Sequence, residues 1–134
     1  MSVVSAVAPS SILIVDDIRE NRVLLEFILE REGFHTTSAE SGEEALESVA
    51  SSRPSLILLD LMLPGIDGFE VTARLKRDPA TAGIPVLIVS AMHDRATRLR
   101  VVDAGAADLL VKPIDRVELC RRIRELLVGG EAPA

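Results

Sequence analysis

The chain lacks tryptophan and tyrosine, and its three phenylalanines bring the aromatic share to only 2% of 134 residues. Because 48% of the residues are still hydrophobic, we expect a core of leucine, isoleucine, valine and alanine, as in a buried sheet covered by helices. The single cysteine excludes an internal disulfide and any metal site made of several thiolates. The length fits one domain with a substantial core.

Positive charge and long apolar runs are also scarce. The chain carries 15 basic and 21 acidic residues, a net charge of -6, and we therefore expect no direct binding to nucleic acid, whose phosphates require lysine and arginine. No stretch approaches the roughly 18 uninterrupted apolar residues of a membrane span. The first ten residues have no basic segment typical of a signal peptide. We expect a cytoplasmic domain without a membrane anchor, in which residues 1–10 form a flexible lead-in.

Short β-branched runs alternate with longer segments that have helical spacing. The expected strands are residues 11–15, 34–39, 56–59, 86–90 and 107–111, and the expected helices are 19–32, 42–51, 69–77, 94–104 and 115 to about 129. Apolar strands that are each followed by a helix imply a parallel sheet with helices on both faces. The sequence therefore predicts one α/β domain over residues 11–128, a (βα)5 doubly wound parallel sheet, with residues 129–134 as a flexible tail or truncated linker.

Polar side chains stand at the ends of four of these strands. They are Asp16 and Asp17 after the first, Asp60 after the third, Ser90 at the fourth and Lys112 after the fifth. Ligand crevices of open α/β sheets lie at this edge, and clustered carboxylates need a compensating cation. Mg²⁺ prefers carboxylates, water and phosphate oxygens. The pattern predicts Mg²⁺-dependent phosphoryl transfer in which Asp60 is the nucleophile and Lys112 and Ser90 contact phosphoryl oxygens.

Each of these residues alone also has an ordinary structural explanation. An aspartate at the end of a strand often caps a helix or shapes a loop, and an acidic pair favours a helix N-terminus. A Lys-Pro pair commonly ends a strand, although Pro113 can also hold a cis bond that aims Lys112. The functional interpretation depends on the whole set, in this order on these strands.

Four segments, ILIVDD, LILLDLMLPGIDGFE, IPVLIVSA and GAADLLVKPI, together resemble the receiver domain of two-component response regulators. The resemblance covers about residues 11–128. It implies a flavodoxin-like fold with strand order 2-1-3-4-5 and a phosphoryl group received from a histidine kinase or histidine phosphotransfer protein. It also implies that the chain is no enzyme beyond catalysing its own phosphorylation and dephosphorylation.

The resemblance further assigns roles to single residues. Asp60 would be the phosphoacceptor and form an aspartyl phosphate. Asp17 would bind Mg²⁺ directly and Asp16 mainly through water, with the Asp60 side chain and the backbone carbonyl of Met62 as further ligands. The bond between Lys112 and its proline, Pro113, is typically cis in the family.

The resemblance also implies a switch. In the family, the hydroxyl residue that corresponds to Ser90 moves toward the phosphate, and an aromatic residue of the fifth strand rotates inward. Leu109 stands at that position here, three residues before Lys112, and a leucine can still change rotamer to fill the space that Ser90 leaves. We expect the signal to reach a downstream partner or output domain through the fourth helix, fifth strand and fifth helix. Phosphorylation-dependent dimerisation stays open.

Two methionines, Met62 and Met92, come two residues after Asp60 and Ser90, at positions that shape the access of water in the family. We expect these apolar side chains to slow hydrolysis and give a long-lived phosphoryl state. A measured half-life of seconds would contradict this expectation.

Three alternatives accompany the leading hypothesis. The chain could be a receiver-like interaction scaffold that works without phosphorylation, although such modules usually lose one of the site residues. It could be the receiver part of a larger multidomain regulator or hybrid kinase. A phosphohydrolase would generally have a second acid where Met62 stands, and neither a P-loop nor a dinucleotide motif occurs.

Overall fold

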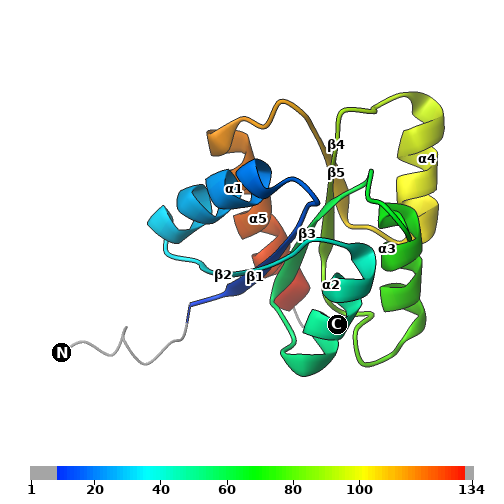
Figure 1. Ribbon diagram of the computed structural model, residues 1–134, viewed down its shortest axis with the longest axis horizontal. Coiled ribbons are helices and arrows are strands. Elements are labelled where there is room, and N and C mark those ends of the chain that lie inside the picture. Colours follow the sequence, from blue (N-terminus) through cyan, green and yellow to red (C-terminus); the bar gives the residue numbers. More distant parts are fainter. Residues whose placement is uncertain (1–8, 132–134) are drawn as a thin grey trace.

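The computed structural model describes residues 9–131, in which five strands and five helices alternate along the chain (Figure 1). The strands are β1 (Ser11–Val15), β2 (His35–Ala39), β3 (Leu56–Asp60), β4 (Val86–Ser90) and β5 (Asp108–Val111). The helices are α1 (Arg19–Arg31), α2 (Gly42–Ser51), α3 (Gly68–Arg77), α4 (Arg95–Ala104) and α5 (Arg116–Glu131). All strands pair in parallel in the order β2-β1-β3-β4-β5, which confirms the predicted flavodoxin-like fold.

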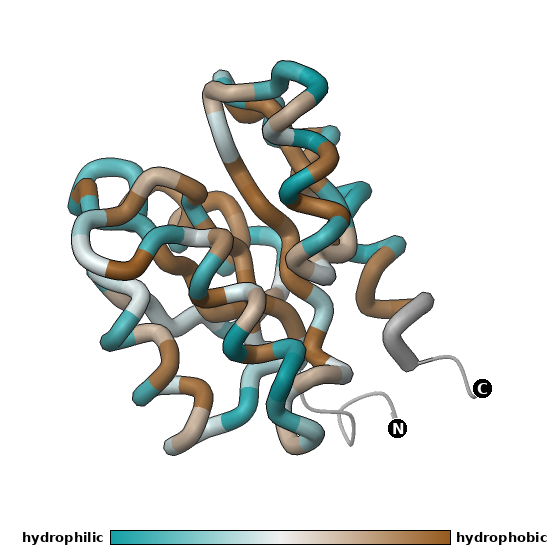
Figure 2. The backbone as a smooth tube through the Cα atoms, turned by 90° about the vertical axis from the view of Figure 1, so that its right-hand side faces the viewer, coloured by the Kyte–Doolittle hydropathy of each residue, from teal (hydrophilic) through white to brown (hydrophobic). Residues whose placement is uncertain are grey.

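Helices cover both faces of the sheet, with α1 and α5 on one face and α2, α3 and α4 on the other (Figure 1). Each face holds its own hydrophobic cluster: Leu13, Ile57 and Leu59 belong to one, and Ile14 and Leu58 to the other. Neighbouring residues of a strand point to opposite faces, and for this reason the inner strands are apolar throughout. Figure 2 shows the hydrophobic residues running through the interior of the molecule.

No helix within residues 9–131 combines the length and hydropathy needed to cross a bilayer.

The observed ends of the elements lie within one residue of the predicted ones, except that α5 ends about two residues later than expected. The expected capping box before α2 is only half formed: Ser41 accepts the N–H of Glu44 at 3.1 Å, but the Glu44 carboxylate accepts the N–H of Glu40 at 2.6 Å. Helix α5 continues through two glycines to Glu131, beyond the expected end near Gly129. A glycine costs a helix about 1 kcal/mol but does not by itself end it. The remaining parts of the predicted terminal segments, residues 1–8 and 132–134, lie outside the described residues.

Candidate functional site

Three aspartates meet at the carboxyl edge of the two central strands. Asp16 and Asp17 directly follow β1, and Asp60 is the last residue of the neighbouring strand β3. One carboxylate oxygen from each of the three lies within 4.8 Å of the others. Asp16 and Asp60 are buried, whereas Asp17 is exposed. An all-oxygen cluster with this spacing could hold a hard divalent cation.

Two hydrogen-bond donors hold the carboxylate of Asp60. The Nζ of Lys112 donates to Oδ2 at 3.2 Å, and the N–H of Met62 donates to Oδ1 at 3.1 Å. Burial raises the pKa of Asp60, because the loss of hydration outweighs the opposing effects of the Met62 N–H and of Lys112. The nearby charge of Asp16 also raises this pKa. Asp60 is thus a weakly hydrated carboxylate whose charge is balanced locally by one lysine.

Lys112 reaches Asp60 because β5 pairs with β4 and ends beside it. The N–H of Lys112 donates to the carbonyl of Ser90 at 2.9 Å, and the Lys112–Pro113 peptide bond is cis. Ser90 itself is almost fully buried at the end of β4, where its Oγ accepts the N–H of Met92 at 2.9 Å. Accepting this bond leaves the hydroxyl hydrogen of Ser90 free to be donated elsewhere.

The residues that orient Asp16 were not identified from the sequence. The N–H of Ile18 donates to Oδ1 of Asp16 at 2.9 Å, and Nδ2 of Asn21 donates to Oδ2 at 3.2 Å. Arg22 donates to the backbone carbonyl of Asp16 at 2.9 Å. The sequence does contain a signal for this contact. Asn21 comes five residues after Asp16, in the first turn of α1, and this helix begins shortly after β1 ends.

A cavity of about 290 Å³ opens beside this cluster, between α1 and the segment that follows β5. Four polar side chains line it: Asp16, Asn21, Asp60 and Lys112. The other lining residues are hydrophobic, namely Val15, Leu24, Leu25, Ile28, Leu58, Val89, Pro113 and Ile114. The acidic cluster therefore adjoins an apolar recess that extends under α1.

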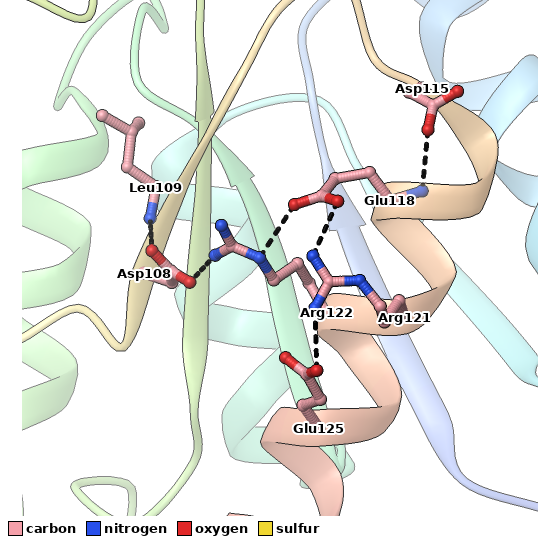
Figure 3. Close-up of polar contacts among 7 residues, drawn as sticks. All are labelled: Asp108, Leu109, Asp115, Glu118, Arg121, Arg122 and Glu125. Carbon is pink, nitrogen blue, oxygen red and sulfur yellow. Dashed lines mark hydrogen bonds and ion pairs between the residues drawn. The ribbon is translucent and has the colours of Figure 1, made fainter.

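Leu109, the residue at the predicted switch position, is already buried in the core layer of α2, α3 and α4. Its neighbour Asp108 points to the opposite side, where it pairs with Arg122 of α5 (Figure 3). Arg122 also donates to Glu118 at 3.0 Å, and Glu118 accepts a further bond from Arg121 at 2.7 Å. The Arg122–Asp108 pair connects α5 to the strand that carries Leu109, and the two pairs with Glu118 lie within α5.

Replacing Arg122 by methionine is expected to lower the free energy of unfolding by only about 0.5–1 kcal/mol. The side chains of Arg122 and Asp108 are 27% and 39% exposed, so water and salt screen their interaction, and methionine preserves the aliphatic stem. Urea unfolding at low and high salt measures the effect, which should shrink at high salt. Arg95→Met, at a position with no ion pair within residues 9–131, is the control. A loss that is large and independent of salt would contradict this prediction.

Comparison with known proteins agrees with this arrangement. The family described as "Response regulator receiver domain" matches residues 12–124. The response regulator PleD of Caulobacter vibrioides is 46% identical over 115 residues, which are 86% of this chain but only 25% of PleD, so the chain spans a quarter of that relative. Protein PilH of Pseudomonas aeruginosa is 34% identical over 88% of this chain and 98% of its own length. The signal receiver domain of a signal transduction histidine kinase from Syntrophus aciditrophicus superposes with a TM-score of 0.86 at 32% identity, covering 93% and 95% of the two chains.

Proposed function

Since this chain belongs to the response regulator receiver domain family of two-component signalling, we propose that Asp60 accepts a phosphoryl group from a phosphohistidine. The donor is a histidine kinase or a histidine phosphotransfer protein in the cytoplasm. The observation that carries the proposal is the buried Asp60 carboxylate, held at 3.2 Å by Lys112 and at 3.1 Å by the Met62 N–H, with two further aspartates beside it.

In the proposed reaction, a carboxylate oxygen of Asp60 attacks phosphorus in line while the phosphorus–nitrogen bond of the donor breaks. Poor hydration, the cause of the raised pKa of Asp60, makes this carboxylate more basic and less shielded by water. Lys112 exchanges its contact with Oδ2 for a phosphoryl oxygen, and Ser90 donates its hydroxyl hydrogen to another. No other substrate is turned over: the chain catalyses only its own phosphorylation and dephosphorylation.

The three carboxylates beside one another at Asp60 fit Mg²⁺, which prefers oxygen ligands. Asp17 would bind the ion directly and Asp16 through water, with the Asp60 carboxylate and the Met62 carbonyl completing the protein ligands. When bound, the ion neutralises the acidic cluster and the charge on the phosphoryl oxygens. Asn21 and the Ile18 N–H keep the Asp16 carboxylate oriented toward the site.

The decisive experiment measures intact mass after incubation with acetyl phosphate and Mg²⁺. We expect a gain of one phosphoryl group that requires Mg²⁺, is prevented by EDTA and is removed by hydroxylamine, which cleaves acyl phosphates. Peptide mapping after borohydride reduction should place the group on Asp60. If neither acetyl phosphate nor a phosphohistidine donor protein modifies the chain, the proposal is wrong and the scaffold alternative is favoured.

The exposed apolar face of α1 suits the docking of a histidine-bearing partner. Ile18, Val23, Leu24 and Phe27 are all exposed on or just before this helix, and Leu24 also lines the cavity beside Asp60. A large protein donor must bury part of this surface to bring its histidine to Asp60, whereas acetyl phosphate needs no such contact.

We therefore expect Phe27→Ser to slow phosphotransfer from a histidine donor protein by roughly tenfold, as loss of an aromatic anchor does. Its rate of labelling by acetyl phosphate should stay unchanged. Val102→Ser, at an exposed apolar position on α4, is the matched control and should behave like the wild type with both donors. Equal slowing with both donors would show that Phe27 affects the site rather than docking.

The output is proposed to pass through α4, β5 and α5. Leu99 and Val102 are exposed on α4, and Leu109 follows Asp108, which pairs with Arg122 of α5. A downstream partner or output domain would bind this face. Phosphorylation would also allow two copies of the chain to dimerise through the same surface. If Asp60→Asn bound the partner as tightly as the phosphorylated protein does, this part of the proposal would be wrong.

A further inference from the structure

Few atoms of this chain are easily oxidised. The whole sequence contains three methionines, one cysteine and no tryptophan or tyrosine, and Met1 lies outside the described residues. Cys120 is buried, and its pKa is raised mainly by that burial, so its thiol stays protonated and a poor nucleophile toward oxidants. Met62 and Met92, in contrast, are 62% and 39% exposed. Within residues 9–128, Met62 and Met92 are therefore the thioethers that solvent can reach.

Both exposed methionines lie at the phosphorylation site. Met62 is two residues beyond Asp60 and donates its N–H to Oδ1 of that carboxylate at 3.1 Å. Met92 is two residues beyond Ser90 and donates its N–H to Oγ at 2.9 Å. Asp60 and Ser90 end two neighbouring strands, β3 and β4. The two thioether side chains thus belong to equivalent positions on adjacent loops that border the site.

Their exposure is unusual because methionine generally fills gaps in hydrophobic cores. Neither side chain belongs to the hydrophobic clusters of the sheet, so stability does not require an apolar residue at either position. Conversion of an exposed methionine to its sulfoxide leaves the fold intact but replaces an apolar group by a polar hydrogen-bond acceptor.

We propose that Met62 and Met92 form a redox-modification site that takes oxidants of the peroxide class and shortens the life of the aspartyl phosphate. The thioether sulfur attacks the outer oxygen of the peroxide, the oxygen–oxygen bond breaks, and the proton of the transferred oxygen passes to the departing one. The sulfur loses two electrons, and the peroxide is reduced to water or an alcohol. Each sulfoxide oxygen then accepts hydrogen bonds from water and holds that water beside the phosphoryl group. The unoxidised thioether sulfur is only a weak hydrogen-bond acceptor and holds water poorly.

This inference rests on the proposed function, and the experiment separates the two. Unmodified protein, protein oxidised by dilute hydrogen peroxide and oxidised protein treated with methionine sulfoxide reductases are each loaded from acetyl phosphate with Mg²⁺. After the donor is removed, intact mass follows the loss of the phosphoryl group, and peptide mapping locates the added oxygen. We expect sulfoxide on both residues, a phosphoryl half-life shortened roughly threefold or more by the water that the sulfoxides hold, and recovery after reduction.

The double variant Met62→Leu/Met92→Leu is the control, because leucine is similar in volume and cannot form a sulfoxide. It is compared only with itself before and after peroxide, and its half-life should not respond. An unchanged half-life in wild-type protein oxidised at both residues would overturn the inference, as would an equal response of the double variant. Failure of the untreated protein to accept any phosphoryl group would overturn the proposed function instead, while sulfoxide formation could still be measured.

Discussion

Asp60→Asn is expected to reduce phosphoryl incorporation to the detection limit and, in metal-free buffer at neutral pH, to raise the melting temperature. Asparagine cannot form the acyl phosphate, so the first effect follows directly from the proposed role. The second follows from burial: only 7% of Asp60 is exposed, and a buried carboxylate whose ionisation is disfavoured destabilises the fold. We expect a gain of a few degrees, since about 1 kcal/mol shifts the melting temperature of a domain of this size by roughly 3–6 °C.

The gain should depend on pH in a definite direction. The pKa of Asp60 is raised in the folded protein above its ordinary value of 3.8, so folding favours the protonated form. The contribution of this group to stability is fully present below about pH 3.8 and is lost as the pH rises through the folded pKa. The difference in melting temperature between variant and wild type should therefore be small at acidic pH and grow toward neutral pH.

Scanning calorimetry with EDTA measures this difference, and a second series with Mg²⁺ tests its cause. Mg²⁺ should stabilise the wild type by binding the folded state and should stabilise Asp60→Asn much less. Asp103→Asn, an exposed aspartate on α4, is the control and should be phosphorylated normally. A destabilised Asp60→Asn protein at neutral pH would mean that Lys112 and the Met62 N–H more than compensate for burial.

Gly68→Ala is expected to lower the free energy of unfolding by about 1–3 kcal/mol, the usual cost of overpacking, and to slow phosphorylation. A Cβ at Gly68 would lie 2.8 Å from the carbonyl oxygen of Asp60 and 2.8 Å from Cα of Leu61. Both atoms belong to the backbone and cannot move without shifting the end of β3. Because the displaced segment carries the proposed nucleophile, we expect phosphorylation by acetyl phosphate to fall roughly tenfold.

Gly83→Ala provides the matched control. A Cβ there would meet only the end of the Arg53 side chain at 3.5 Å, an ordinary contact, so stability should change by less than about 0.5 kcal/mol. Chemical unfolding and initial rates of phosphorylation are measured on both variants. Unchanged stability of Gly68→Ala would refute the close approach, and lost stability with an unchanged rate would show that Gly68 does not position Asp60.

The sequence predicted the fold and the composition of the site for identifiable reasons. The apolar runs that end at Asp16, Asp60 and Ser90 mark buried parallel strands, and one topological rule places the ends of such strands at a common edge. Met62 lies at the site because it comes only two residues after Asp60 in the chain. These conclusions follow from the path of the backbone alone and do not depend on where any side chain points.

Other features depend on side-chain directions and loop paths, which spacing does not determine. That Lys112 contacts Oδ2 of Asp60 rather than Asp16 or Asp17 depends on rotamers. Asn21 orients Asp16 because its Nδ2, in the first turn of α1, reaches Oδ2 of Asp16, and this contact depends on the path of the short segment between β1 and α1. The exposed apolar face of α1, which includes Phe27, was likewise not foreseen, since hydrophobic residues in a helix are ordinarily assigned to the core.

The two outermost strands bear on how copies of this chain can associate. Exposed strand edges invite pairing between molecules and aggregation, and natural sheets counter this with short, polar edge strands. Here the strongly hydrophobic strands β1, β3 and β4 lie inside the sheet, while β2, with the sequence HTTSA, has three of its five residues exposed. The opposite edge strand, β5, has four residues and begins with Asp108. Edge-to-edge growth of the sheet is therefore disfavoured, and self-association of the folded chain is left to its helices.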